Sequence, residues 1–284
     1  MKIGITLPNQ VLGMDPRIIP RWAALAEEAG FSTLGTVGRF AYPGVSDTVA
    51  LAASAGATSR IGLLSHVLLA PTWPAHLLAK EVAGIDGVSG GRLTLGIGAG
   101  IRDDDFVVEG HGPRDRGRRL DADLEIYRSV WKGDPVGGGS RSAVPPGTRQ
   151  IPLLFGATSD AAFRRAAREG DGYIGATLPP SMVAPSFDAA REAWDRAGRS
   201  SPPRLVALSY VGIGALEQAR ANVHDYYSVF GDELATMVSG GLAGGTAAIR
   251  ERVAEFEELG ADELMLLSGI ADLDEVARLA DTVL

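Results

Sequence analysis

Eight short apolar segments alternate with amphipathic helical patterns along the chain. Short apolar runs bounded by turn residues are typical of buried β-strands. Because two parallel strands need a crossover between them, a repeated strand–helix pattern predicts a parallel sheet with helices outside it. The expected strands are Lys2–Leu7, Ser32–Val37, Ile61–Leu69, Leu93–Gly98, Ile151–Phe155, Gly172–Ile174, Leu205–Val211 and Glu263–Leu267.

Eight such units fit a closed (β/α)8 TIM barrel, a fold of the α/β class for which about 250 residues are typical. The competing fold is an open doubly wound sheet. Its G-x-G-x-x-G fingerprint is missing at Gly96–Gly100, and no acidic strand end follows about 20 residues later. With 284 residues, the chain is therefore expected to form one barrel domain over residues 1–284.

Glycines mark the ends of three predicted helices. Gly30, Gly170 and Gly260 each precede the next strand, and a glycine at this position commonly ends a helix in the left-handed conformation. Each of the three can therefore adopt it. The glycine- and proline-rich segment Gly133–Gln150 predicts a loop between the fourth helix and the fifth strand, not a domain boundary.

The composition argues against several classes of function. A net charge of −8 disfavours nucleic acid or an anionic membrane as the main partner. The absence of cysteine excludes disulfides and thiolate metal sites, and it fits a reducing cytoplasm. None of the four histidines has metal-ligand spacing, so we expect no metal site. No segment has the length of apolar sequence that a membrane span needs.

The functional site of a TIM barrel lies at the carboxyl ends of its strands. This topology predicts which segments meet at the mouth of the barrel. They are Thr6–Asn9, Gly38–Arg39, His66–Val67, Gly98–Arg102, Gly156–Ser159, Gly175–Thr177, Tyr210 and Ser268.

The segment Gly156–Asp160 follows a strand and opens a helix. Free backbone N–H groups and the helix dipole at such a position can hold a phosphate. The same residues also fit a plain helix cap by Ser159 or Asp160. The residues alone favour the plain cap and leave the phosphate site as the alternative.

A composite motif between Ala70 and Gly100 is more specific than any single glycine pattern. It reads A-P-x-x-P, then L-A-K, then D-x-x-S-G-G-R-L-x-L-G-x-G-x-G. This string resembles the bacterial luciferase-like family of flavin- and deazaflavin-dependent oxidoreductases, and shorter matches extend over nearly the whole chain. The resemblance implies a TIM barrel with reduced FMN or coenzyme F420 across its mouth.

The resemblance also implies where the cofactor lies. Relatives hold its phosphate at the loop matching Gly156–Ser159, with Gly175–Thr177 as a second wall. They often have a non-prolyl cis peptide at the bond matching His66–Val67, beneath the cofactor ring. The cofactor-binding residues implied in this way are Thr6, Leu7, His66, Val67, Gly98, Gly100, Gly156, Ala157, Thr158, Ser159, Gly175, Ala176 and Thr177.

Three residues are candidates for a catalytic role: His66, Arg39 and Arg102. A single histidine at a strand end also fits a structural role. In the cis-peptide hypothesis, the backbone at His66, and not its imidazole, contacts the cofactor ring. Arg39 stands where many relatives carry a polar pair such as Asp-His. Arg102 precedes Asp103–Asp105, which read as a solvated loop, and it can reach an anionic substrate.

The resemblance leaves the reaction open between three functions. The first is oxygenation of a small organic substrate with reduced FMN, supplied by a partner flavin reductase. The second is hydride transfer with coenzyme F420, and the third is flavin binding without turnover. The segment Thr177–Pro179 lacks the lysine that some F420-dependent relatives place near the phosphate, which favours FMN. In the family, insertions near Gly133–Gln150 shape the substrate pocket, so the short segment in this chain implies an open pocket. We also expect the protein to form a homodimer.

Overall fold

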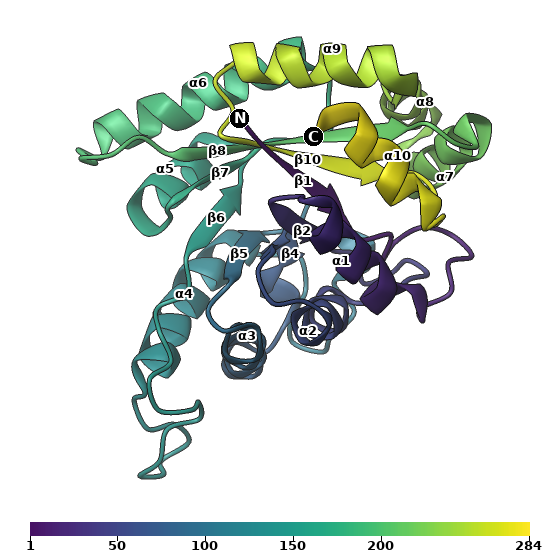
Figure 1. Ribbon diagram of the computed structural model, residues 1–284. Helices are drawn as coiled ribbons and strands as arrows, with labels where there is room; N and C mark the ends of the chain where they lie inside the picture. Colours follow the sequence, from purple (N-terminus) through teal and green to yellow (C-terminus); the bar gives the residue numbers. More distant parts are fainter.

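The computed structural model describes residues 1–284. Parallel strands close into a barrel in the order β10-β1-β2-β3-β5-β6-β7-β8, and β8 pairs with β10 to complete it (Figure 1). The predicted single-domain TIM barrel is confirmed. Its strands are β1 (Lys2–Thr6), β2 (Thr33–Thr36), β3 (Gly62–Ser65), β5 (Leu93–Gly98), β6 (Leu153–Gly156), β7 (Gly172–Ile174), β8 (Arg204–Gly212) and β10 (Glu263–Ser268).

Two additional short strands extend the barrel at its mouth. The predicted strand Ile61–Leu69 is interrupted after Ser65, and it resumes as β4 (Leu68–Leu69) beside β5. His66 and Val67 lie in this interruption. Likewise β9 (Ala243–Gly244) pairs with the end of β8. Both short strands therefore lie where the functional site was expected.

Helices cover the outside of the barrel (Figure 1). No helix is both long and apolar enough to span a membrane. The barrel helices are α1 (Ile18–Ala29), α2 (Asp47–Ala57), α3 (Ala75–Ser89), α4 (Arg116–Lys132), α5 (Asp160–Glu169), α6 (Pro180–Arg196), α9 (Gly245–Glu258) and α10 (Asp274–Val283). Short 3-10 turns are η1 (Ala70–Thr72) and η2 (Asp103–Asp105).

A helical pair between β8 and α9 departs from the simple strand–helix repeat. It consists of α7 (Leu216–Tyr227), the 3-10 turn η3 (Ser228–Phe230) and α8 (Asp232–Gly240). The two helices pack against each other at the carboxyl end of β8, on the right of Figure 1. This insertion therefore lies over the mouth of the barrel.

Two apolar layers hold the fold together. The larger lies between the sheet and the helices and includes the buried Trp22, Trp131 and Trp194. The smaller fills the inside of the barrel with the side chains of Leu64, Leu154, Ile174, Val206, Leu208, Met265 and Leu267. Close packing inside the barrel leaves the functional chemistry to its rim.

The helix-ending glycines divide into two kinds. Gly30 and Gly260 have φ angles of 95° and 75°, so the left-handed prediction is confirmed for both. It is wrong for Gly170, whose φ is −110°. A Cβ atom at Gly170 would lie 2.7 Å from the ring of Phe155, so this position needs glycine for space.

The segment Gly133–Gln150 lies between α4 and β6, as predicted, at the lower left of Figure 1. Near its end, the Arg149 guanidinium pairs with Asp86 on α3 and donates to the Leu93 carbonyl at the start of β5. These contacts place it at the amino end of the barrel. The expectation that it borders the substrate pocket is therefore wrong, because the mouth lies at the opposite end.

Candidate functional site

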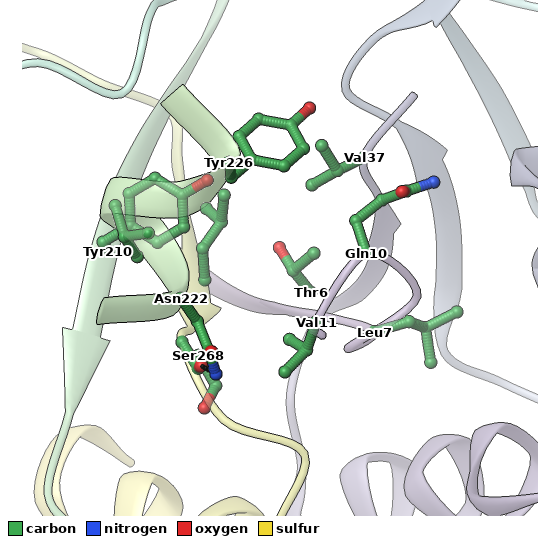
Figure 2. Close-up of a pocket in the computed structure, with 12 residues that line it drawn as sticks. Thr6, Leu7, Gln10, Val11, Val37, Tyr210, Asn222, Tyr226 and Ser268 are labelled. Carbon is green, nitrogen blue, oxygen red and sulfur yellow. Dashed lines mark hydrogen bonds between the residues drawn. The ribbon is translucent and has the colours of Figure 1, made fainter. Parts of the chain in front are cut away.

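A small pocket opens at the mouth between the ends of β1, β8 and β10 (Figure 2). Thr6 and Tyr210 from the strands and Tyr226 from α7 turn toward one space there. Its volume is about 30 Å³, little more than a water molecule needs. The lining residues are Thr6, Leu7, Gln10, Val11, Val37, Tyr210, Asn222, Val223, Tyr226, Leu267, Ser268 and Gly269. Of the segments predicted at the mouth, Thr6, Leu7, Tyr210 and Ser268 border this pocket.

His66 lies beneath the pocket and not in it. Its side chain is buried, and its Nε2 atom shares a hydrogen bond of 2.9 Å with the Thr6 hydroxyl. A Cβ atom at Gly35 would lie 2.3 Å from the same Nε2, so the glycine makes room for the ring. Burial lowers the pKa of His66 to about 4, which keeps the imidazole neutral at neutral pH. His66 therefore reaches the pocket only through Thr6.

The His66–Val67 peptide is cis, which confirms that part of the sequence prediction. The Val67 side chain lies against two glycines at the strand ends. If Gly98 carried a Cβ atom, that atom would lie 2.9 Å from a Val67 methyl group. A Cβ atom on Gly156 would lie 3.4 Å from the other Val67 methyl group. The ends of β5 and β6 thus make room for the Val67 side chain, and the three residues together form an apolar floor. This "glycine floor" is Val67, Gly98 and Gly156.

The loop after β6 has the geometry predicted for a helix cap. The Ser159 hydroxyl accepts a hydrogen bond of 3.4 Å from the Ala162 amide at the start of α5. Thr158 and Ser159 are exposed, whereas Ala157 is buried. Because a helix leaves its first amides without intrahelical acceptors, this exposed end can also receive an anion. The cap is confirmed, and the phosphate site stays a prediction.

The loop after β7 contacts the inserted helices. Gly175 packs closely, since a Cβ atom there would lie 3.1 Å from Val183 and 3.2 Å from Phe187. The Thr177 hydroxyl shares a hydrogen bond with the hydroxyl of Tyr227 on α7. Ala176 between them is exposed. The second predicted wall of the cofactor site is therefore tied to the end of α7.

Arg39 joins two loops of the mouth. Its guanidinium is buried and donates to Asp105 at 3.1 Å and to Asp104 at 2.7 Å. Asp105 also accepts the amides of Phe40 and Ala41, each at 2.8 Å. The prediction of a solvated loop is wrong at Asp105, which is fully buried because it has these partners. With its donors engaged in this way, Arg39 holds the β2 and β5 loops together, and a catalytic role for it stays a prediction.

Arg102 is enclosed by aromatic rings. Its guanidinium carbon lies 4.6 Å from the ring centres of both Tyr226 and Phe230, and 5.5 Å from that of Tyr227. Its Nη1 donates to the Tyr226 hydroxyl at 3.3 Å, while its Nε is buried without an acceptor. We call Arg102, Tyr226, Tyr227 and Phe230 the Arg102 cage. It connects the β5 loop with the insertion.

The sequence analysis did not assign Tyr226, Tyr227 or Phe230 to the site. Their helix looked like any other helix of the barrel, and a helical pattern does not show where a helix lies. One signal was present: the interval from Val211 to Glu263 is far longer than one crossover helix needs. A long interval after a barrel strand is where an insertion over the mouth can be found.

A buried acid lies beside the mouth at the start of α2. Asp47 is buried, and burial raises its pKa to about 7. A Cβ atom at Gly38 would lie 2.8 Å from its Oδ2. No group of three or more His, Asp or Glu side chains is arranged to hold a metal ion. Asp47 is therefore an isolated buried carboxyl group.

Comparison with known proteins gives one family. The family model described as luciferase-like monooxygenase matches residues 1–238. An uncharacterized protein of Mycobacterium tuberculosis is 29% identical over 219 residues, which are 67% of this chain and 76% of that protein. The structure of an F420-dependent secondary alcohol dehydrogenase has a TM-score of 0.81 at 17% identity and covers 99% of this chain and 98% of its own.

A second solved structure has the same fold. The monooxygenase RslO1 of Streptomyces bottropensis has a TM-score of 0.78 at 23% identity, over 100% of this chain and 98% of its own. These structural likenesses confirm the barrel. The family match covers β1 to β8 together with the glycine floor, the loop at Gly156–Ser159 and most of the insertion. The chain belongs to the luciferase-like monooxygenase family, whose members are flavin- or F420-dependent oxidoreductases.

Proposed function

We propose that the chain binds reduced FMN across the mouth of the barrel and oxygenates a small organic substrate. The observation that carries this proposal is the glycine floor. A planar ring system packs well against a low apolar surface, and because Gly98 and Gly156 carry no side chains, only Val67 rises from the floor. The residues at the mouth therefore fit a flavin ring.

The residues of the mouth would divide the work between them. Thr158, Ser159 and the first amides of α5 would hold the phosphate, while the glycine floor carries the ring. When bound, reduced FMN supplies the electrons that activate O2. The tyrosines of α7 would exclude water from the ring, since Tyr226 already lines the pocket. His66 would act through Thr6 by fixing the position of its hydroxyl.

Entry of the cofactor requires the end of α7 to move. The pocket of about 30 Å³ is far smaller than a three-ring group. Several contacts hold α7 over the mouth, among them the hydrogen bond between Tyr227 and Thr177, the hydrogen bond from Tyr42 to Asp225, and the packing of Tyr226 against Arg102. We infer that the insertion is a cover that opens for the cofactor and closes behind it.

Hydride transfer with coenzyme F420 is the second candidate function. The glycine floor supports this candidate as well, because it can accept a deazaflavin ring as readily as a flavin ring. The missing lysine at Thr177–Pro179 favours FMN over it. Flavin binding without turnover is the third candidate.

Binding and turnover assays separate the three functions. The purified protein is titrated with FMN and with F420, each reduced and oxidised, and oxidation of the reduced cofactors is then followed with a panel of organic compounds. Tight binding of reduced FMN with substrate-dependent O2 consumption supports the main proposal. Binding of F420 with O2-independent turnover replaces it by hydride transfer. Cofactor binding without turnover of any compound favours the third function.

A further inference from the structure

Three arginines lie in or against the Asp103–Asp105 segment or directly before it, and of these only Arg102 lacks an acidic partner. Arg39 pairs with Asp104 and Asp105, and Arg116 pairs with Asp103. The Nε of Arg102 is buried and has no acceptor. A buried N–H donor without an acceptor carries a desolvation cost that a bound anion would relieve. The site is therefore incomplete without a negative group.

One edge of the Arg102 guanidinium has an N–H group without a hydrogen-bond partner. Tyr226 and Phe230 lie close to the guanidinium, whose N–H groups point outward in its own plane. One edge is taken up because Nη1 donates to the Tyr226 hydroxyl. The other edge carries the unpaired Nε beside Nη2, and two parallel N–H groups of this kind match the two oxygens of a carboxylate.

Nearby acids do not fill this position. Asp103, Asp104 and Asp105 are engaged with the other two arginines. Asp225 precedes Tyr226 on α7, and its carboxylate accepts the Tyr42 hydroxyl at 2.8 Å. A ligand therefore remains as a source of an anion for Arg102.

The surroundings of Arg102 suit a ligand with an aromatic body. Tyr226 packs edge-on against Tyr42 and Tyr227, with ring centres 5.0 and 5.2 Å apart. Tyr227 packs in the same way against Tyr210, which lines the pocket. Exposed Ile101 lies beside Arg102 in the chain. A series of packed aromatic rings thus runs from the pocket to the cage.

We propose that the Arg102 cage binds the carboxylate of the substrate, and that the substrate is an aromatic carboxylic acid. This inference rests on the proposed function. The same oxyanion chemistry is present in the phosphate of FMN and in the acidic groups of F420. The test must therefore distinguish a substrate carboxylate from an oxyanion of the cofactor.

Benzoate and its neutral analogue benzamide are suitable probes, with binding measured by isothermal titration calorimetry. Benzoate should bind the wild-type protein, and Arg102→Gln should weaken it by at least about tenfold, because a charge-assisted hydrogen-bonded pair is lost. Arg116→Gln, in the neighbouring segment, is the matched control and should leave benzoate affinity unchanged. Benzamide should bind weakly to all three proteins.

Cofactor titrations of the same variants identify the source of the oxyanion. Unchanged FMN and F420 affinity in Arg102→Gln, with benzoate binding lost, supports the substrate carboxylate. Loss of cofactor affinity with unchanged benzoate binding assigns Arg102 to the cofactor and overturns the inference. Absence of benzoate binding to the wild type also overturns it. If FMN still binds in that case, the proposed function stands; if neither FMN nor F420 binds, the proposed function fails by itself.

A second variant covers the case in which Arg102→Gln does not fold, as judged by circular dichroism. Arg102→Lys keeps the charge but cannot form two parallel N–H contacts. It should bind benzoate more weakly than the wild type and more tightly than any folded Gln variant. Wild-type benzoate affinity in the Lys variant would overturn the assigned geometry.

Discussion

At the scale of single residues, buried charge decides how the mouth is held together. Asp105 is the centre of this arrangement, because one carboxylate serves the Arg39 guanidinium and two backbone amides. Removal of one partner from a buried ion pair leaves the other charge uncompensated, which costs more than the pair itself contributes. The stability of the β2 and β5 loops therefore depends on this single side chain.

Replacement of Asp105 tests this dependence. Asp105→Ala should lower the free energy of unfolding by about 3–5 kcal/mol, since Arg39 stays buried without its main acceptor. Urea denaturation followed by circular dichroism measures the change. Asp103→Ala is the control, because its pair with Arg116 is exposed and should contribute less than about 1 kcal/mol. Equal losses in the two variants would contradict the central role of Asp105.

Asp47 gives stability a pH dependence. Its folded pKa of about 7 lies above the ordinary value of 3.8, so the folded state keeps a proton that the unfolded chain releases. Stability from this group is therefore lost as the pH rises from about 4 to about 7. Asn cannot ionise, so the Asp47→Asn variant should not lose this stability. Between about pH 4 and about pH 7, its free energy of unfolding relative to that of the wild type should therefore rise by up to about 4 kcal/mol.

Urea denaturation of both proteins at several pH values measures this difference. The buried His66 acts in the opposite sense, because its lowered pKa makes stability rise with pH between about 4 and 6.5. That contribution is present in both proteins and cancels in the comparison. A difference that does not vary with pH would show that the pKa of Asp47 is the same in the folded and unfolded states.

Gly156 tests the glycine floor. A Cβ atom there would already lie 3.4 Å from Val67, and the methyl groups of valine would rise above the floor. Gly156→Val should weaken FMN binding by about tenfold, or about 1.4 kcal/mol, with little change in unfolding temperature. Fluorescence titration measures the affinity. Gly84→Val on the exposed side of α3 is the control, and equal affinity in both variants would argue against a ring at this place.

At the scale of elements, the insertion of α7 and α8 determines access to the mouth. Tyr227→Phe removes the hydrogen bond to Thr177 and should loosen the end of α7. We expect faster hydrogen exchange over residues 216–230 and a higher cofactor association rate, measured by mass spectrometry and stopped flow. Tyr127→Phe is the control, because its hydroxyl on α4 is buried without a partner. Identical association rates in both variants would show that α7 does not limit entry.

The same insertion marks the limit of prediction from sequence. All eight barrel strands were found because buried parallel strands leave continuous apolar runs, and the mouth segments followed from the topology. The contact of Arg39 with Asp105 joins residues far apart in the chain, and no periodic pattern reports such a pair. The Arg102 cage depends on where α7 lies in space. Only the tertiary fold shows either of them.

At the scale of the whole molecule, cofactor binding should raise the free energy of unfolding of the protein. A ligand that binds only the folded protein stabilises it by about 2.7 kcal/mol at a concentration 100 times its dissociation constant. For a chain of this size, that corresponds to a rise of roughly 5 °C in unfolding temperature. Calorimetry with FMN and F420 separately should show the larger rise with FMN. A larger rise with F420 would favour hydride transfer.

The closure of the barrel also has a consequence for biosynthesis. β1 pairs with β2 on one side and with β10 on the other, so Lys2 lies beside Glu263. While the chain grows on the ribosome, one edge of β1 therefore exposes unpaired backbone groups until β10 has been translated. Exposed strand edges are templates for aggregation. A nascent chain of this protein should need a chaperone until its last strand is made, and it should become protease-resistant only then.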